Sequence, residues 1–177
     1  ALSGRAHEAA GAPAYWPWVQ AIRSYVSTVD PEALRSQLGS GATEVARVVS
    51  EVGERLPSLT EPSPPSDPEE AQFRLFDAIT AFLKNASNVT PLLIVLDDLH
   101  WADRSSLLLL EHLVREMGES RLLLIGCYRD TDISRQHTLA ETLAQVSREP
   151  VFRRQSLRGL EQDDLGRFVS AASGISP

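Results

Sequence analysis

Two adjacent carboxylates, Asp97 and Asp98, directly follow the apolar run LLIVL at residues 92–96. Burying an unpaired carboxylate is costly, so acids at the end of an apolar segment are explained if a cation or its water shell lies opposite. Mg²⁺ keeps most of its waters and is held through one or two carboxylates together with substrate phosphates. Because side chains alternate along a strand, one acid can hold a hydrated metal while the other orients or deprotonates an attacking water.

A turn at the protein surface explains the same two acids without a metal. Asp103 follows them and is a suitable N-cap for the apolar helix that comes next. Residues 97–103 are therefore also typical of a simple connection between a strand and a helix. The pattern alone leaves both interpretations open.

The acids lie in a segment where predicted strands and helices alternate. Apolar runs predict strands at residues 92–96, 122–125 and 152–157, and helical spacing predicts helices at 103–117, 137–148 and 161–172. The uninterrupted LLIVL run is typical of a strand buried on both faces of a parallel sheet. This alternation predicts an α/β fold with right-handed crossovers, in which ligands gather at the carboxyl ends of the strands.

The front of the chain is predicted to be helical. Apolar side chains recur at helical spacing over residues 15–29 and 45–52, and Asp-Pro-Glu at residues 30–32 and again at residues 67–69 predicts a helix start. The proline-rich stretch LTEPSPPSD at residues 59–67 predicts an exposed connector. We therefore divide the chain into a helical part, 1–66, and an α/β part, 67–177.

Composition excludes several classes of protein. The chain of 177 residues has a net charge of −7, which argues against non-specific nucleic-acid binding. No apolar run approaches the roughly 20 residues of a membrane-spanning helix, so we expect no membrane partner. Cys127 is the single cysteine, cannot form an internal disulfide, and is predicted to be a buried structural thiol. These features favour a cytoplasmic protein.

Four segments together resemble a known family. LLIVLDDLHWADRSSLLLLEHL and RLLLIGCYRDTD are similar to the Walker B and sensor strands of P-loop ATPases, and YWPWVQAIR and QFRLFDAITAFL match helices of the same pattern. More narrowly, the chain resembles the signal-transduction ATPase domains with numerous domains (AAA/STAND type) of large bacterial LuxR-type and MalT-like transcriptional regulators. The resemblance implies a partial P-loop NTPase-like parallel sheet flanked by helices, with a helical N-terminal part.

The resemblance also assigns roles to three residues. Asp97 corresponds to the Walker B acid for magnesium, which it holds through water, and Asp98 to the neighbouring acid that also faces the metal and positions the attacking water. Arg129 corresponds to the sensor arginine at the terminal phosphate, a role that suits a permanently charged guanidinium. A surface ion pair with Asp130 or Asp132 is the alternative for Arg129. His100 follows the acids in the family pattern, but we expect it to pack in the loop and not to be catalytic.

The sequence lacks one part of the family pattern. A P-loop requires G-x-x-x-x-G-K-[ST], and the only lysine, Lys84, has no glycine-rich segment before it. The opening LSGRAHE resembles the end of the family's second strand and the residues just beyond it. We therefore expect a fragment of a larger ATPase that begins after the P-loop; a relative that has lost the loop is the alternative.

These inferences lead to two functional hypotheses. The first is a nucleotide-dependent switch in a transcriptional regulator, which uses Mg²⁺ and ATP and contacts other domains of the same protein, with little activity in the isolated chain. The second is a non-enzymatic interaction module of the same fold that binds no nucleotide. Because the family sheet places its first strand at the centre, the chain is also expected to self-associate through exposed strand edges.

Overall fold

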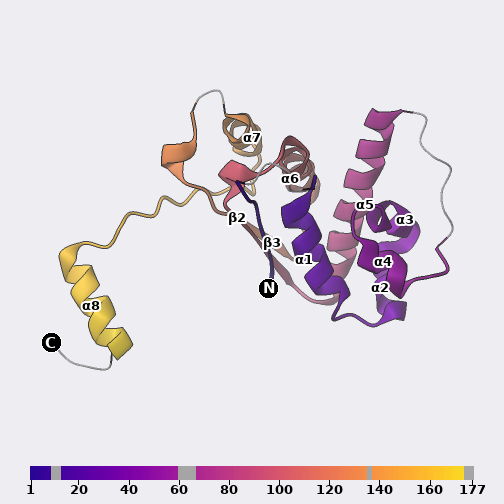
Figure 1. The fold of residues 1–177 in the computed structure, drawn as a ribbon, viewed down its shortest axis with the longest axis horizontal. Coiled ribbons are helices and arrows are strands. Elements are labelled where there is room, and N and C mark those ends of the chain that lie inside the picture. Colours follow the sequence, from indigo (N-terminus) through magenta and orange to yellow (C-terminus); the bar gives the residue numbers. More distant parts are fainter. Residues whose placement is uncertain (9–12, 60–66, 135–136, 174–177) are drawn as a thin grey trace.

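Three parallel strands form the sheet of the computed structural model, which describes residues 1–8, 13–59, 67–134 and 137–173 (Figure 1). They are β1 (Leu2–Arg5), β2 (Leu92–Asp97) and β3 (Leu122–Gly126), in the spatial order β1-β2-β3. Arg5 pairs in register with Asp97, and Leu96 with Gly126. The carboxyl ends of all three strands therefore meet at one edge, as expected for an α/β fold.

The described residues form eight α-helices, of which the last lies apart from the sheet and the other helices (Figure 1). They are α1 (Trp16–Val26), α2 (Pro31–Leu38), α3 (Ala42–Ala46), α4 (Ser50–Arg55), α5 (Pro68–Val89), α6 (Arg104–Glu116), α7 (Thr138–Val146) and α8 (Gln162–Ser173). The predicted helix starts are confirmed, because Asp30, Asp67 and Asp103 each accept hydrogen bonds from backbone N–H groups in the first turn of the helix that follows. None of the described helices is both long and apolar enough to cross a membrane.

The valine-rich segment that we expected to form one helix forms two. α3 ends at Ala46 and α4 begins at Ser50, and the backbone between them leaves the helical region at Val49 (φ −119°, ψ 88°). Val45, Val49 and Val52 are nevertheless fully buried. β-branched residues favour a helix only weakly, so the chain breaks the helix and keeps all three side chains in the core.

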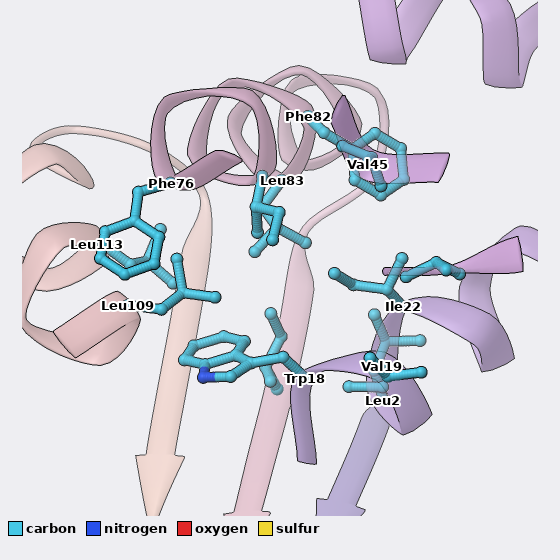
Figure 2. Close-up of a cluster of buried hydrophobic side chains, with 14 of the residues drawn as sticks. Leu2, Trp18, Val19, Ile22, Val45, Phe76, Phe82, Leu83, Leu109 and Leu113 are labelled. Atoms are coloured by element: carbon cyan, nitrogen blue, oxygen red, sulfur yellow. The ribbon is translucent and has the colours of Figure 1, made fainter. Parts of the chain in front are cut away.

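One hydrophobic core joins the helices to one face of the sheet. Trp18 of α1, Leu83 of α5 and Leu109 of α6 lie around a common point above the strands (Figure 2). The indole Nε1 of Trp18 donates to the backbone oxygen of Ser106 at 3.0 Å, which satisfies the one polar atom that this ring buries. The core includes residues from before and after the predicted connector, 59–67. Residues 60–66 of that connector lie outside the described residues.

β1 and α1 approach each other unusually closely. A Cβ atom on Gly4 would lie 1.7 Å from the backbone oxygen of Pro17, so only glycine allows this packing. The contact fixes β1, and with it Arg5, against the first helix.

The sheet is buried on one face only. Leu92, Ile94 and Leu96 of β2 are buried, but Leu93 and Val95 on the opposite face are half-buried. Leu123 and Ile125 of β3, which pair in register with them, are 59% and 41% exposed. The prediction of a strand buried on both faces is therefore wrong. The core helices cover only the face that carries Leu92, Ile94 and Leu96.

The predicted strand at residues 152–157 is also wrong. These residues form no ladder with the sheet, and the chain runs past them to α8, which stands apart from the body of the molecule (Figure 1). Leu157 is 88% exposed. An apolar alternation becomes a strand only where a neighbouring strand offers its backbone groups, and residues 152–157 pair with none of the described strands.

Candidate functional site

The two carboxylates lie at the carboxyl end of β2, the central strand. Asp97 is its last residue and is exposed, and one of its side-chain oxygens accepts the backbone N–H of Asp98 at 3.0 Å. Asp98 has a left-handed backbone (φ 54°, ψ 39°), which turns the chain into a short 3₁₀ helix, Leu99–Trp101. Aspartate tolerates this conformation better than most residues. The two acids therefore face different surroundings, because the strand ends at Asp97 and the left-handed turn at Asp98 redirects the chain.

Asp98 is held by an arginine from the first strand. Nε of Arg5 donates to Oδ2 of Asp98 at 2.6 Å, and Nη2 lies 2.6 Å from the same oxygen. This hydrogen bond from Arg5 lowers the pKa of Asp98 below its ordinary value, and the positive charge of Arg129 acts in the same direction. The carboxylate is therefore ionised over the whole physiological range.

His100 is buried beside Asp98. Its side chain is 1% exposed, and its Nε2 lies 3.9 Å from Oδ1 of Asp98 and 3.5 Å from Oδ2 of Asp132. Neither ring nitrogen has a hydrogen-bond partner among the described residues. The ring also packs against Trp101. The expected packing role is present, and in addition the imidazole faces the carboxylates of Asp98 and Asp132.

Arg129 follows β3 by three residues and is exposed. Within the described part of the chain its side chain makes no hydrogen bond or ion pair, although its backbone oxygen accepts the N–H of Asp132 at 3.2 Å. Asp130 instead pairs with Arg154 at 2.8 Å. The surface ion pair considered from sequence is thus not formed there. Arg129 lies just beyond the carboxyl end of β3, and its positive charge is one of the smaller influences that lower the pKa of Asp98.

Cys127 is exposed at this edge, contrary to the prediction of a buried thiol. Its backbone still extends the ladder, since its N–H donates to the oxygen of Leu96 at 2.8 Å. Partial burial, and after it the negative charges of Asp97 and Asp98, raise the pKa of the thiol above its ordinary value. At neutral pH the thiol is protonated, which makes it a poor nucleophile.

The connection after the acids has a clear structural role. Asp103 accepts the backbone N–H of Ser106 at 3.0 Å and so caps α6, and it also accepts the backbone N–H of Tyr15 at 3.3 Å. One carboxylate therefore satisfies donors at the starts of both α1 and α6. The turn considered as the alternative to a metal site does form, but it uses Asp103 and leaves Asp97 facing solvent.

The donor set suits a metal ion that brings most of its own ligands. No group of three or more metal-ligating side chains exists among the described residues, so these residues form no closed, all-protein metal centre. Mg²⁺ needs only one or two carboxylates beside water and phosphate oxygens. The exposed carboxylate of Asp97 matches that requirement, whereas Oδ2 of Asp98 is occupied by Arg5.

Sequence reasoning did not identify Arg5 as a site residue. The available signal was the segment LSGR, an apolar and small-residue strand that ends in a charge, as LLIVLDD does. Had the two segments been aligned as parallel neighbours, both charged ends would have fallen at one edge. Residues 93 positions apart are brought into contact by this pairing.

Comparison with known proteins identifies the domain. Neither the curated proteins nor the solved structures give a significant match to the chain. Residues 1–125 match the family of the AAA ATPase domain. The match covers more than half of the 177 residues and includes β1, β2, most of β3 and the acid pair. The parallel α/β sheet is consistent with this match, and the chain therefore belongs to the AAA ATPase domain family.

Proposed function

We propose that this domain is part of a nucleotide-dependent switch that uses ATP and Mg²⁺ in a transcriptional regulator. The observation that carries the proposal is the acid pair at the carboxyl end of the central strand, with Arg129 beyond the end of the neighbouring strand. Carboxylates and a guanidinium at one sheet edge provide the opposite charges that a metal–triphosphate complex requires. The role in a regulator rests on the family resemblance of the DDLHWAD and YRD motifs.

Each residue has a distinct task in this proposal. Asp97, being exposed, holds a hydrated Mg²⁺ that neutralises phosphate charge. Asp98 also faces the metal and orients the attacking water. Arg129 contacts the terminal phosphate and reports whether it is present. Exchange of nucleotide then changes how this edge packs against other domains of the same protein.

These 177 residues are expected to turn over little ATP by themselves. Their sequence contains no G-x-x-x-x-G-K-[ST] segment, whose backbone amides and lysine hold the phosphates in P-loop enzymes. Asp97 and Asp98 would hold the metal ion and position the attacking water, but they do not bind the phosphates directly. Apart from the contact proposed for Arg129, the phosphates therefore need a binding segment that these residues do not contain.

Calorimetry with Mg-ATP tests the proposal. The chain is compared with a version that includes the residues that precede Ala1 in its own gene, and each is also made with Asp97→Asn and with the control Asp163→Asn on α8. We expect binding in the longer protein only, weakened by Asp97→Asn and unchanged by the control. Micromolar binding by the present chain, roughly −8 kcal/mol, would show that the phosphate site is not a P-loop and overturn the mechanism.

A second function is favoured by one feature of the sequence. Because Lys84 is the only lysine and lies inside α5, no P-loop lysine is available in these residues. A domain of this fold without nucleotide would serve as a protein-interaction module, and the exposed apolar face of β3 offers a surface for that purpose. If neither protein in the calorimetric comparison binds ATP, this second function replaces the first.

A further inference from the structure

The two acids of the site differ in what already contacts them. Oδ2 of Asp98 lies 2.6 Å from both Nε and Nη2 of Arg5, and Oδ1 faces the buried imidazole of His100 at 3.9 Å. Asp97 is exposed, and the one hydrogen bond that its side chain accepts among the described residues comes from the N–H of Asp98. One carboxylate is therefore open to a cation, and its neighbour is occupied by a positive group of the protein.

The Arg5 side chain is free to leave although its backbone is fixed. The backbone oxygen of Arg5 accepts Nε2 of Gln20 at 3.0 Å, and the next residue, Ala6, donates its N–H to the backbone oxygen of Asp97 at 3.0 Å. The side chain itself is 60% exposed, against 15% for Asp98. An ion pair with an exposed guanidinium is worth little, so a competing cation can displace it without disturbing the sheet.

We propose that Arg5 is a latch on Asp98: it holds this carboxylate in the absence of a divalent cation and releases it when a hydrated Mg²⁺ engages the acid pair. The inference rests on the proposed function, because it assumes that the pair binds a metal, and it adds how that site is kept closed. Arg5 is a positioning residue in this scheme. While it is bound, Oδ2 of Asp98 cannot accept a hydrogen bond from an attacking water without giving up the guanidinium.

Competition between Arg5 and a divalent cation is measurable on the full chain without nucleotide. Mn²⁺, a paramagnetic substitute for Mg²⁺, is titrated into the ¹⁵N-labelled protein, and broadening of the Asp97 and Asp98 amide signals is followed. Arg5→Gln is compared with Arg47→Gln, which removes another exposed arginine ion pair, that with Glu44. We expect Arg5→Gln to lower the half-broadening concentration about two- to fivefold, the range for an exposed ion pair, and Arg47→Gln to leave it unchanged.

A second measurement requires no variant and covers the case in which Arg5→Gln does not fold. The Nε–H signal of Arg5 in the unmodified chain is followed as Mg²⁺ is added, with that of Arg47 as the internal reference. We expect the Arg5 signal to move towards that of a free arginine while the Arg47 signal stays in place. An Arg5 signal that does not move while Mn²⁺ broadens the acid pair overturns the latch.

The outcomes separate the latch from the function on which it rests. If Mn²⁺ broadens the acid pair equally in the unmodified chain and in Arg5→Gln, and Asp97→Asn abolishes the effect, the metal role stands and the latch is wrong. If Mn²⁺ broadens no signal near Asp97 or Asp98 in any variant, the metal role of the pair fails and the latch fails with it.

Discussion

Replacing Gly4 with alanine should be among the most damaging single-methyl changes in this protein. The new Cβ would lie 1.7 Å from the oxygen and 2.5 Å from the carbonyl carbon of Pro17, where distances under 3.0 Å essentially never occur. The clash is between two backbone segments, so no change of side-chain rotamer can relieve it. The backbones of β1 and α1 have to move apart. Overpacking typically costs about 1–3 kcal/mol, and we expect Gly4→Ala to cost about 3 kcal/mol or more.

Two other glycines calibrate this expectation. A Cβ on Gly126 would lie 2.6 Å from Cδ1 of Leu99, which is the end of a flexible side chain, so we expect Gly126→Ala to cost only about 1 kcal/mol. Gly53 lies inside α4, and a Cβ added there would have no neighbouring atom within 4 Å. Gly53→Ala should therefore stabilise the protein by about 0.5–1 kcal/mol, because glycine is a poor helix former.

Urea unfolding followed by circular dichroism and by tryptophan fluorescence measures all three variants. Trp18 is one of three tryptophans, is 1% exposed and directly follows Pro17, so its exposure on unfolding contributes to the change in emission. The steric reasoning is refuted if Gly4→Ala unfolds within about 1 kcal/mol of the unmodified chain, or if Gly126→Ala is the more damaging change. A Gly4→Ala chain that does not fold agrees with it, provided that the other two variants do fold.

Three further expectations concern single side chains. Burial and the charge of Asp97 raise the pKa of Cys127. Asp97→Asn should therefore speed alkylation of the thiol by iodoacetamide at mildly alkaline pH by roughly twofold or more. An unchanged rate would show that the charge of Asp97 does not act on this thiol. Burial also raises the pKa of Tyr25, which donates to Gln37 at 3.0 Å. Its contribution to stability is complete below the unfolded-state pKa near 10 and is lost as pH rises through the folded-state value, so Tyr25→Phe should reduce the alkaline fall in the urea midpoint. Asp30→Ala removes the cap of α2 and should cost about 1 kcal/mol in the same unfolding assay, whereas Asp30→Asn should retain most of the stability.

Local signals in the sequence predicted the elements that depend on local physics. Asp30 and Asp67 stand before Pro-Glu, and each caps a helix as expected, because a cap and the first turn involve only neighbouring residues. The run at residues 92–96 forms β2 for a similar reason, since five apolar residues between polar ends have few other stable arrangements.

The predictions that failed depended on what lies next to a segment in space. Residues 152–157 have the composition of a strand but find no ladder partner among the described strands, and Cys127 is exposed although the run before it is apolar. The helix breaks at Val49, and this break lets Val45, Val49 and Val52 all be buried in the core. None of these outcomes is encoded within a window of a few residues.

The candidate site divides in the same way. Asp97 and Asp98 were identified from sequence because two acids at the end of an apolar strand are a local pattern. Arg5 was not, because its contact with Asp98 spans 93 positions and exists only through the register of β1 with β2. Roles for Asp97, Asp98 and Arg129 remain predictions that the metal and nucleotide titrations address.

The pairing of β1 with β2 also has a consequence for the synthesis of the protein. A ribosome that adds about 5–20 residues per second completes Asp98 roughly 5 to 20 seconds after Arg5, a separation of 93 positions. Closing a loop of that length costs roughly 4 kcal/mol of chain entropy, whereas β2 and β3 are joined by a much shorter connection that contains the 3₁₀ helix and α6. We expect β1 to dock late during translation, so that nascent chains arrested before β2 carry an unpaired edge strand. The guanidinium of Arg5 reaches Asp98 only once β1 has paired with β2, so this contact reports that the long-range pairing has formed.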